Sequence, residues 1–295
     1  MTSNLNPMEH TCMQLNHKKP ELLALDLDGT LFNDSGRVTA ASVAAIQKAA
    51  EAGVKVVVAT GRDYDSVPWE QLAGTDISYA ITTNGSAVYQ KDGRICLYEE
   101  CLPAEKMASV FAYLLEKEVY ISVFIDGKNY TPKRVFPYLA NLELPDYVIN
   151  IILNSRTGID DLVGCVKSGN AKIQKATLLF QKQEDGSFLN YEDVKTYLEN
   201  CPEITVVDGG FHNLEFTKAS VSKGTGLRFL AAHLGVPMER TMAIGDSEND
   251  IEILKAAGLG IAMGNAPETV KAHADTVTRT NEEEGVAHAI EEYVL

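Results

Sequence analysis

Short apolar segments that end abruptly in polar residues are the feature that most limits how this chain folds. Segment 22–25 stops at Asp26, and the β-branched segment 54–59 stops at Thr60. Such segments are typical of strands that are buried on both faces of a parallel sheet. Between them, Thr39 is placed to cap a helix and Gly53 to end it, so strand and helix alternate. The pattern predicts an α/β fold.

The alternation of strand and helix is interrupted between residues 86 and 211 and resumes near Ser222. Inside the interruption, glycine-containing turns join segments with strand character, as in β-hairpins, and helical stretches lie between them. Right-handed crossovers and short connections favour a doubly wound, Rossmann-like parallel sheet for the rest. We therefore expect an N-terminal tail (1–19), an α/β core (20–85 and 212–295) and an inserted α+β domain (86–211).

Composition restricts the partners and the location of the protein. Lys and Arg total 26 against 41 Asp and Glu, and the net charge of −15 repels nucleic-acid phosphates. The longest apolar run, 110–115, is far shorter than the roughly 20 residues that span a membrane. Residues 1–19 lack the apolar stretch of a secretory signal, and the 5 cysteines contain no C-x-x-C pair. We expect a cytoplasmic protein with no nucleic-acid or membrane partner.

Four aspartates follow strands whose carboxyl ends should meet at one edge of the sheet. They are Asp26, Asp28, Asp246 and Asp250. Ligands of open α/β sheets bind outside these strand ends, so the four carboxylates should converge. Neighbouring carboxylates raise one another's pKa unless a cation neutralises them. Because the donors are all oxygens, with no His or Cys nearby, the pattern indicates a hard cation, and magnesium is the leading candidate.

The other polar residues at this edge suit a phosphate group. Thr60 offers a hydroxyl, Gly61 allows a close approach to the backbone, and Lys223, at a helix start, offsets anionic charge. Asn84 and Gly85 follow a third strand and are candidates for the substrate pocket.

An aspartate in such a site can act as a nucleophile on phosphorus and form an aspartyl-phosphate. Asp28, two residues after Asp26, can protonate the leaving oxygen and then activate water. The residues thus predict phosphoryl transfer with Asp26 and Asp28 as the catalytic pair.

Four motifs resemble, in order, those of the phosphatases of the haloacid dehalogenase superfamily. They are Asp26-Leu27-Asp28-Gly29-Thr30-Leu31, Thr60-Gly61-Arg62, Lys223 and Gly245-Asp246-Ser247-Glu248-Asn249-Asp250. Further segments resemble the Cof-type group (subclass IIB), which carries a large α/β cap: Thr83-Asn84-Gly85, Val221-Ser222-Lys223-Gly224, Ala262-Met263-Gly264-Asn265-Ala266 and 281–287. The resemblance covers about residues 20–295. It implies Mg²⁺-dependent hydrolysis of a small phosphorylated metabolite, such as a sugar phosphate, a nucleotide, flavin mononucleotide or pyridoxal phosphate.

The resemblance also implies a role for each matching residue. Asp26 would be the nucleophile and a metal ligand, and Asp28 the general acid and base and a ligand through its backbone carbonyl. Asp246 would be the second carboxylate on magnesium, with Asp250 behind it. The phosphoryl oxygens would be held by Leu27 (through its backbone), Thr60, Gly61, Lys223 and Asn249.

Other functions fit part of this pattern. A phosphomutase or phosphotransferase would pass the phosphoryl group to a sugar hydroxyl instead of water. A receiver-type signalling module also joins Asp, magnesium and Lys on a parallel sheet. Asp28, which speeds dephosphorylation, and an insert of about 125 residues disfavour that module.

Several conspicuous side chains receive no role in the expected site. We expect Arg62 to be structural and Trp69 to serve packing. In the cap, a solvated position is the better expectation for three cations: Arg134, Lys172 and Lys175.

Overall fold

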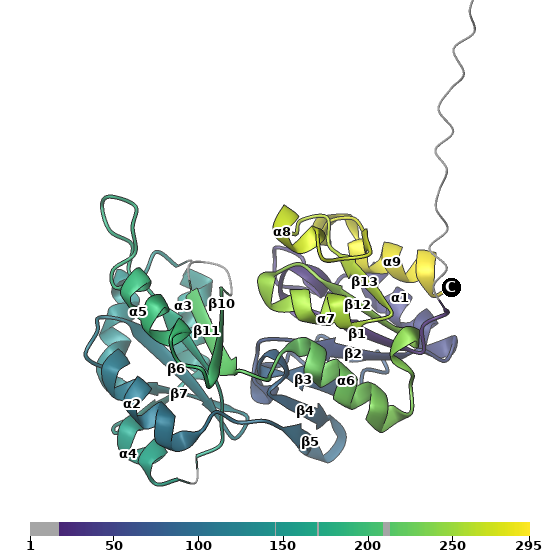
Figure 1. Cartoon of the computed structure of the whole chain (residues 1–295). Helices are drawn as coiled ribbons and strands as arrows, with labels where there is room; N and C mark the ends of the chain where they lie inside the picture. Colours follow the sequence, from purple (N-terminus) through teal and green to yellow (C-terminus); the bar gives the residue numbers. More distant parts are fainter. Residues whose placement is uncertain (1–17, 145, 170, 209–212) are drawn as a thin grey trace, which may run out of the picture.

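The computed structural model describes residues 18–144, 146–169, 171–208 and 213–295, so most of the expected tail 1–19 lies outside it. The described residues form an 8-stranded and a 6-stranded sheet, which lie side by side with helices against each (Figure 1). None of the helices in this part of the chain combines the length and apolar composition that a membrane crossing requires.

The larger sheet has the order β14-β13-β12-β1-β2-β3-β4-β5. Its strands are β1 (Leu22–Leu25), β2 (Lys55–Ala59), β3 (Tyr79–Thr82), β4 (Ala87–Gln90), β5 (Ile95–Glu99), β12 (Thr241–Gly245), β13 (Leu259–Ala262) and β14 (Thr276–Val277). Neighbours from β14 to β3 pair in parallel, while β4 and β5 pair antiparallel. The central β1 is buried on both faces, as expected.

Alternate side chains of β1 enter two separate cores. Leu23 and Leu25 pack with α1 (Ala40–Glu51) and α9 (Gly285–Tyr293). Leu22 and Ala24 pack on the other face, with α6 (Lys223–Leu234), α7 (Ile251–Ala256) and α8 (Glu268–Lys271). Helices therefore cover both faces of a mainly parallel sheet, which confirms the predicted doubly wound fold.

The smaller sheet has the order β10-β11-β9-β6-β7-β8. Its strands are β6 (Tyr120–Ile125), β7 (Lys128–Pro132), β8 (Thr157–Ile159), β9 (Ile173–Leu179), β10 (Ile204–Asp208) and β11 (Asn213–Lys218). Its apolar face packs against α2 (Ala104–Leu114), α4 (Leu162–Lys167) and α5 (Tyr191–Glu199). Ile152 of α3 (Asp146–Ser155) packs with Tyr120 of β6 in a further cluster. We call this body the cap.

The cap boundaries expected at residues 86 and 211 do not coincide with the points where the chain passes from one sheet to the other. The hairpin of β4 and β5 extends the core sheet, because Ala87 and Val88 pair with β3 and are buried there. At the other end, β11 belongs to the cap sheet, where it pairs with β9 and β10. The turn residues predict a hairpin correctly, but they do not encode which sheet the hairpin joins.

Candidate active site

The carboxyl ends of β1 and β12 bring Asp26 and Asp246 together. The two strands are parallel neighbours, with Leu25 opposite Ile244, so the residues that follow them lie at the same edge. Gly29 closes the turn after β1 with φ +83°, and a Cβ there would lie 2.4 Å from Asp246 Oδ2. Only glycine fits this position, since both the backbone conformation and the space exclude a side chain.

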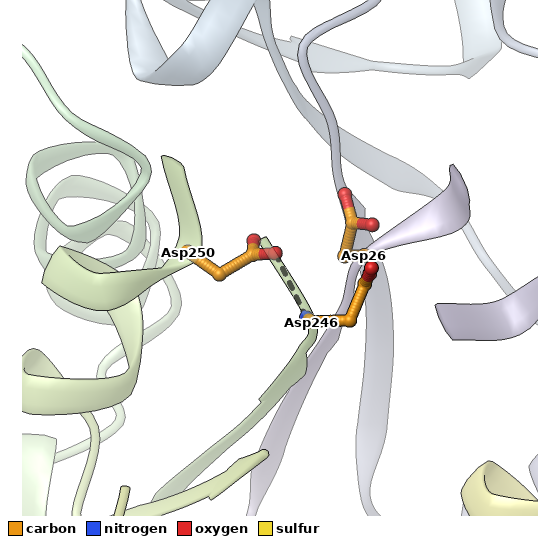
Figure 2. A group of neighbouring side chains, drawn as sticks. All are labelled: Asp26, Asp246 and Asp250. Carbon is orange, nitrogen blue, oxygen red and sulfur yellow. Dashed lines mark hydrogen bonds between the residues drawn. The ribbon is translucent and has the colours of Figure 1, made fainter. Parts of the chain in front are cut away.

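Asp26, Asp246 and Asp250 each offer a carboxylate oxygen within 4.8 Å of the others (Figure 2). Thr30 Oγ1 donates a hydrogen bond of 2.7 Å to Asp246 Oδ1. Asp250 accepts hydrogen bonds of 3.0 Å from the backbone N–H groups of Asp246 and Ser247. The carboxylate of Asp250 thereby fixes the turn that carries Asp246.

Lys223 joins two of these carboxylates from the first turn of α6. Its Nζ lies 2.6 Å from Asp26 Oδ1 and 2.7 Å from Asp250 Oδ1, and the side chain is almost completely buried. A capping box between Ser222 and Thr225 fixes this end of the helix. Burial lowers the pKa of Lys223, but the two carboxylates raise it by more, so the amine stays charged.

The site holds more negative than positive charge. Burial raises the pKa of Asp26 well above its usual value; Asp250, Asp246 and Asp28 raise it further, and Lys223 only partly offsets them. Burial, followed by the charge of Asp250, raises the pKa of Asp246 to about 6. A carboxylate cluster of this kind is stabilised when a cation occupies it. The all-oxygen donor set suits magnesium.

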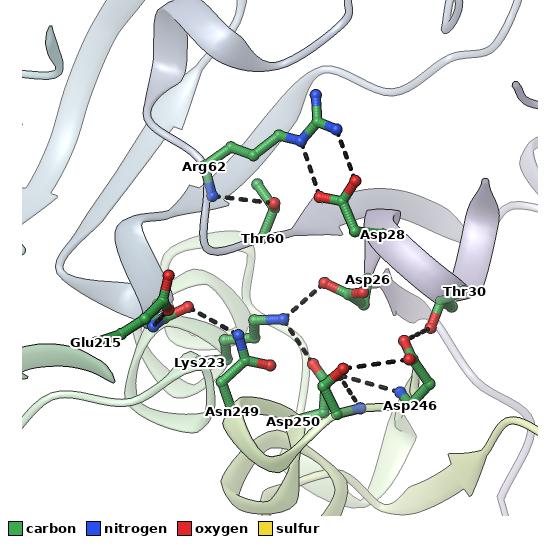
Figure 3. A network of polar contacts seen from close by, with 12 residues as sticks. Asp26, Asp28, Thr30, Thr60, Arg62, Glu215, Lys223, Asp246, Asn249 and Asp250 are labelled. Carbon is green, nitrogen blue, oxygen red and sulfur yellow. Dashed lines mark hydrogen bonds and ion pairs between the residues drawn. The ribbon is translucent and has the colours of Figure 1, made fainter. Parts of the chain in front are cut away.

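Asp28 lies at the rim of the site and is bound by Arg62. Its two oxygens accept hydrogen bonds from Arg62 Nη2 and Nε, at 2.6 and 2.8 Å (Figure 3). Arg62 also donates to the Ser66 carbonyl oxygen and lies over the Phe32 ring. Arg62, which we expect to be structural, thus holds a candidate catalytic residue in place, because its planar fork fits the carboxylate of Asp28.

The expected phosphate-binding residues lie around Asp26. The Thr60 hydroxyl oxygen accepts a hydrogen bond of 3.1 Å from the N–H of Arg62. Asn249 Nδ2 donates to Asn84 Oδ1 at 3.2 Å, and Asn249 Oδ1 is buried without a hydrogen-bond partner. Leu27 follows Asp26 directly, and its side chain packs in the core.

Gly61 and Gly85 are the two glycines of the expected substrate edge. A Cβ at Gly85, where φ is +95°, would lie 1.9 Å from Ser222 O. At Gly61 it would lie 2.9 Å from Asn84 Oδ1 and 3.2 Å from Lys175 Nζ. Glycine therefore allows a cap side chain to reach the phosphate edge of the core.

Lys175 and Glu215 of the cap form a buried ion pair beside this edge. Lys175 Nζ lies 2.5 Å from Glu215 Oε1, and Asn84 Nδ2 donates to Glu215 Oε2 at 2.6 Å. Burial raises the pKa of Glu215, but Lys175 and the hydrogen bond from Asn84 lower it by more, so it lies below the usual value. The prediction that Lys175 is solvated is wrong, since its side chain is 2% exposed.

Glu215 is absent from the expected site, although the sequence contains a clue to it. It lies between Leu214 and Phe216, whose side chains enter the cap core, so alternation directs a charged residue to the opposite face. Local sequence does not show that this face meets the core. The exposed Lys172 pairs with Glu99, exposed Arg134 donates to the Leu115 carbonyl oxygen, and Trp69 packs on the core, all as expected.

Comparisons with known proteins agree with this geometry. Residues 23–290 match the family model of haloacid dehalogenase-like hydrolases. Phosphatase YwpJ of Bacillus subtilis is 33% identical over 91% of this chain and 98% of its own length. The 5-amino-6-(5-phospho-D-ribitylamino)uracil phosphatase YitU of the same organism is 30% identical over 93% and 98%. A haloacid dehalogenase-like hydrolase structure from B. subtilis superposes with a TM-score of 0.79 at 30% identity, covering 93% of this chain and 100% of the other.

Proposed function

Because this chain belongs to the family of haloacid dehalogenase-like hydrolases, we propose that it is a magnesium-dependent phosphatase that acts on a small phosphorylated metabolite through an aspartyl-phosphate at Asp26. The observation that carries the proposal is the buried cluster of Asp26, Lys223, Asp246 and Asp250 at the end of β1. The phosphatases named among its relatives support the same class of reaction.

The donor set suits a bound magnesium ion. Asp26 and Asp246 would hold it through carboxylate oxygens, and Asp28 through its backbone carbonyl, while Asp250 orients the turn of Asp246. When bound, the ion supplies positive charge that lets an anionic phosphate approach a carboxylate. The excess of buried carboxylates over the single ammonium of Lys223 supports this assignment.

The reaction at phosphorus would proceed in two displacements. A carboxylate oxygen of Asp26 forms a bond to phosphorus while the bond to the leaving oxygen breaks, and the protonated carboxyl of Asp28 gives that oxygen its proton. The Asp28 carboxylate then takes a proton from water, whose oxygen attacks phosphorus and releases Asp26 and inorganic phosphate. Both Asp28 oxygens bind Arg62 in the structure, so one of them must turn to the leaving oxygen while the other keeps its hydrogen bond to Arg62 and holds Asp28 in position.

The remaining residues would orient the phosphoryl group. Lys223 offsets the charge of its oxygens and holds Asp26 in place. Thr60, Gly61, Asn249 and the backbone of Leu27 would donate hydrogen bonds to it. Asn84 and Gly85 would border the leaving group, where the cap closes over the site and excludes bulk water.

We also propose that the protein acts in the cytoplasm and does not bind nucleic acid. The net charge of −15 supports the second statement, because it opposes binding to phosphate backbones.

A screen of phosphate esters tests the function. The full chain is assayed with magnesium against sugar phosphates, nucleotides, flavin mononucleotide, pyridoxal phosphate and p-nitrophenyl phosphate, with the Asp26→Asn variant as the control. We expect release of inorganic phosphate from at least one ester. Formation of an isomeric phosphate ester without phosphate release would instead identify a phosphomutase, and a stable phosphoprotein with no turnover a signalling module.

A further inference from the structure

The face of the cap sheet opposite its apolar core carries polar side chains next to the phosphate edge. Side chains alternate along its strands, so Leu214, Val123 and Ala176 enter the cap core. Their neighbours face the opposite way, and the strand register aligns them across the sheet: Glu215 opposite Thr177, Lys175 opposite Phe124, and Phe124 opposite Asn129. Residues directly opposite each other share a face. We call the row Glu215, Lys175, Phe124 and Asn129 the polar row.

The first half of the polar row satisfies its own charges and hydrogen bonds. Lys175 pairs with Glu215, which also accepts from Asn84 of the core. The ammonium of Lys175 lies 4.9 Å from the centre of the Phe124 ring. This half therefore anchors the row beside Gly61.

The second half of the polar row has hydrogen-bonding groups without partners. Asn129 is 3% exposed, and both its Nδ2 and its Oδ1 are buried with no hydrogen-bond partner. Buried amides are almost always hydrogen-bonded, so such a group calls for a ligand or water. The next strand adds Arg156, one residue before β8, whose Nε is also buried without a partner.

Arg156 lies at the far end of the polar row. Its guanidinium is 6.0 Å from the centre of the Phe124 ring. Burial lowers the pKa of Arg156, while Tyr120 and, less strongly, Asp63 in the loop after β2 raise it. The contacts therefore run without interruption from Gly61 at the phosphate edge, through Lys175 and Phe124, to the unpartnered groups of Asn129 and Arg156.

The chemistry of Asn129 selects its partner. A carboxylate or phosphate accepts hydrogen bonds only, so it would leave Asn129 Oδ1 unsatisfied. The partner must offer a donor next to an acceptor. The lactam edge of a heterocycle does so, and so do the neighbouring hydroxyls of a sugar.

We propose that Asn129 is a specificity-determining residue that binds the far end of the leaving group through adjacent donor and acceptor atoms, with Arg156 Nε donating to the same end. Two strand spacings separate Lys175 on β9 from Asn129 on β7, which corresponds to about 10 Å. The preferred substrates are then phosphate monoesters with a long, neutral, polar leaving group. This inference rests on the proposed phosphatase function.

The test compares kcat/KM for three esters with the full chain and magnesium. Flavin mononucleotide carries a lactam edge, a disaccharide phosphate carries neighbouring hydroxyls, and p-nitrophenyl phosphate is the short reference. In Asn129→Leu we expect kcat/KM for one long ester, relative to the reference, to fall at least tenfold. The nearly isosteric Asn129→Asp, which has no donor when ionised, should show the same fall in kcat/KM. The ester that is affected shows whether Asn129 binds a lactam edge or neighbouring sugar hydroxyls.

Thr131→Val is the matched control. Thr131 is equally buried on β7, two residues from Asn129, but its hydroxyl already bonds Tyr120 and Ser122. Thr131→Val should lower the melting temperature but leave the ratio of kcat/KM for the long ester to kcat/KM for p-nitrophenyl phosphate unchanged. Asn129→Leu should change this ratio without lowering the melting temperature. An unchanged ratio in both Asn129 variants, or a wild type that prefers p-nitrophenyl phosphate to both long esters, overturns the inference. Failure to hydrolyse any ester, the reference included, refutes the proposed function instead.

Discussion

The core and the cap both bury charged side chains at their junction, but they balance them differently. In the core, three carboxylates share one ammonium, that of Lys223. In the cap, Lys175 and Glu215 pair one to one, and the groups without a hydrogen-bond partner include the neutral amide of Asn129 and the Nε of Arg156. This difference supports our proposals that the core receives a cation and a phosphate and that the cap binds an uncharged polar group.

Loss of a core carboxylate should have the largest effect. Asp26→Asn keeps the size of the side chain but removes the attacking charge, so we expect kcat to fall by about 10⁴-fold or more. Steady-state kinetics on the best ester measures it, and circular dichroism verifies the fold. A rate close to wild type would show that the core carboxylates are not the nucleophilic centre.

Removal of the cation tests the charge excess directly. Excess chelator should abolish turnover, and magnesium should restore it. Calcium should bind but support little turnover, because its looser coordination misplaces the reacting groups. Magnesium should also raise the melting temperature, since it binds the folded state. Full activity in excess chelator would contradict the assigned donor set.

The balanced pair in the cap should instead matter for stability. Glu215→Gln leaves the buried Lys175 without its counter-charge, and we expect unfolding free energy to fall by about 3 kcal/mol. The pKa of Glu215 is lowered in the folded state. Its stabilisation is therefore complete above the ordinary Glu pKa and lost as the pH falls through the lowered value.

Denaturant unfolding at neutral and acidic pH measures this loss. The difference in unfolding free energy between Glu215→Gln and wild type should become smaller at acidic pH. Lys133→Met, which removes an exposed pair with Asp160, is the control and should change stability by less than about 1 kcal/mol. Equal losses in both variants would remove the distinction between the buried pair and an ordinary surface pair.

The contact between Arg62 and Asp28 should have the smallest effect of the four. Arg62→Lys keeps the charge but cannot donate two parallel hydrogen bonds. We expect kcat to fall about tenfold with little change in KM, because Asp28 loses its fixed position while the phosphate contacts remain. If kcat is unchanged and only KM rises, Arg62 binds substrate instead of positioning Asp28.

The site in the core can be predicted from the sequence because its residues directly follow the strands that position them. The strands β1, β2, β3 and β12 each end in a motif, and parallel pairing gathers those ends at one edge, as for Asp26 and Asp246. The cap lacks such motifs. Glu215 and Lys175 are far apart in sequence and become a site only through the pairing of β9 with β11, and the hairpin of β4 and β5 could join either sheet. Tertiary pairing of this kind cannot be predicted from turn residues and alternation alone.

The central claim is that Asp26 carries the phosphoryl group. Asp28→Asn retains the nucleophile but slows hydrolysis of the intermediate, so incubation with p-nitrophenyl phosphate and magnesium should allow the phosphoenzyme to accumulate. Mass spectrometry of the peptide that contains Asp26, after a rapid acid quench, should show one phosphoryl group on Asp26, absent from the double variant with Asp26→Asn. Release of p-nitrophenol with no modified peptide, or a phosphoryl group on another residue, would contradict the account.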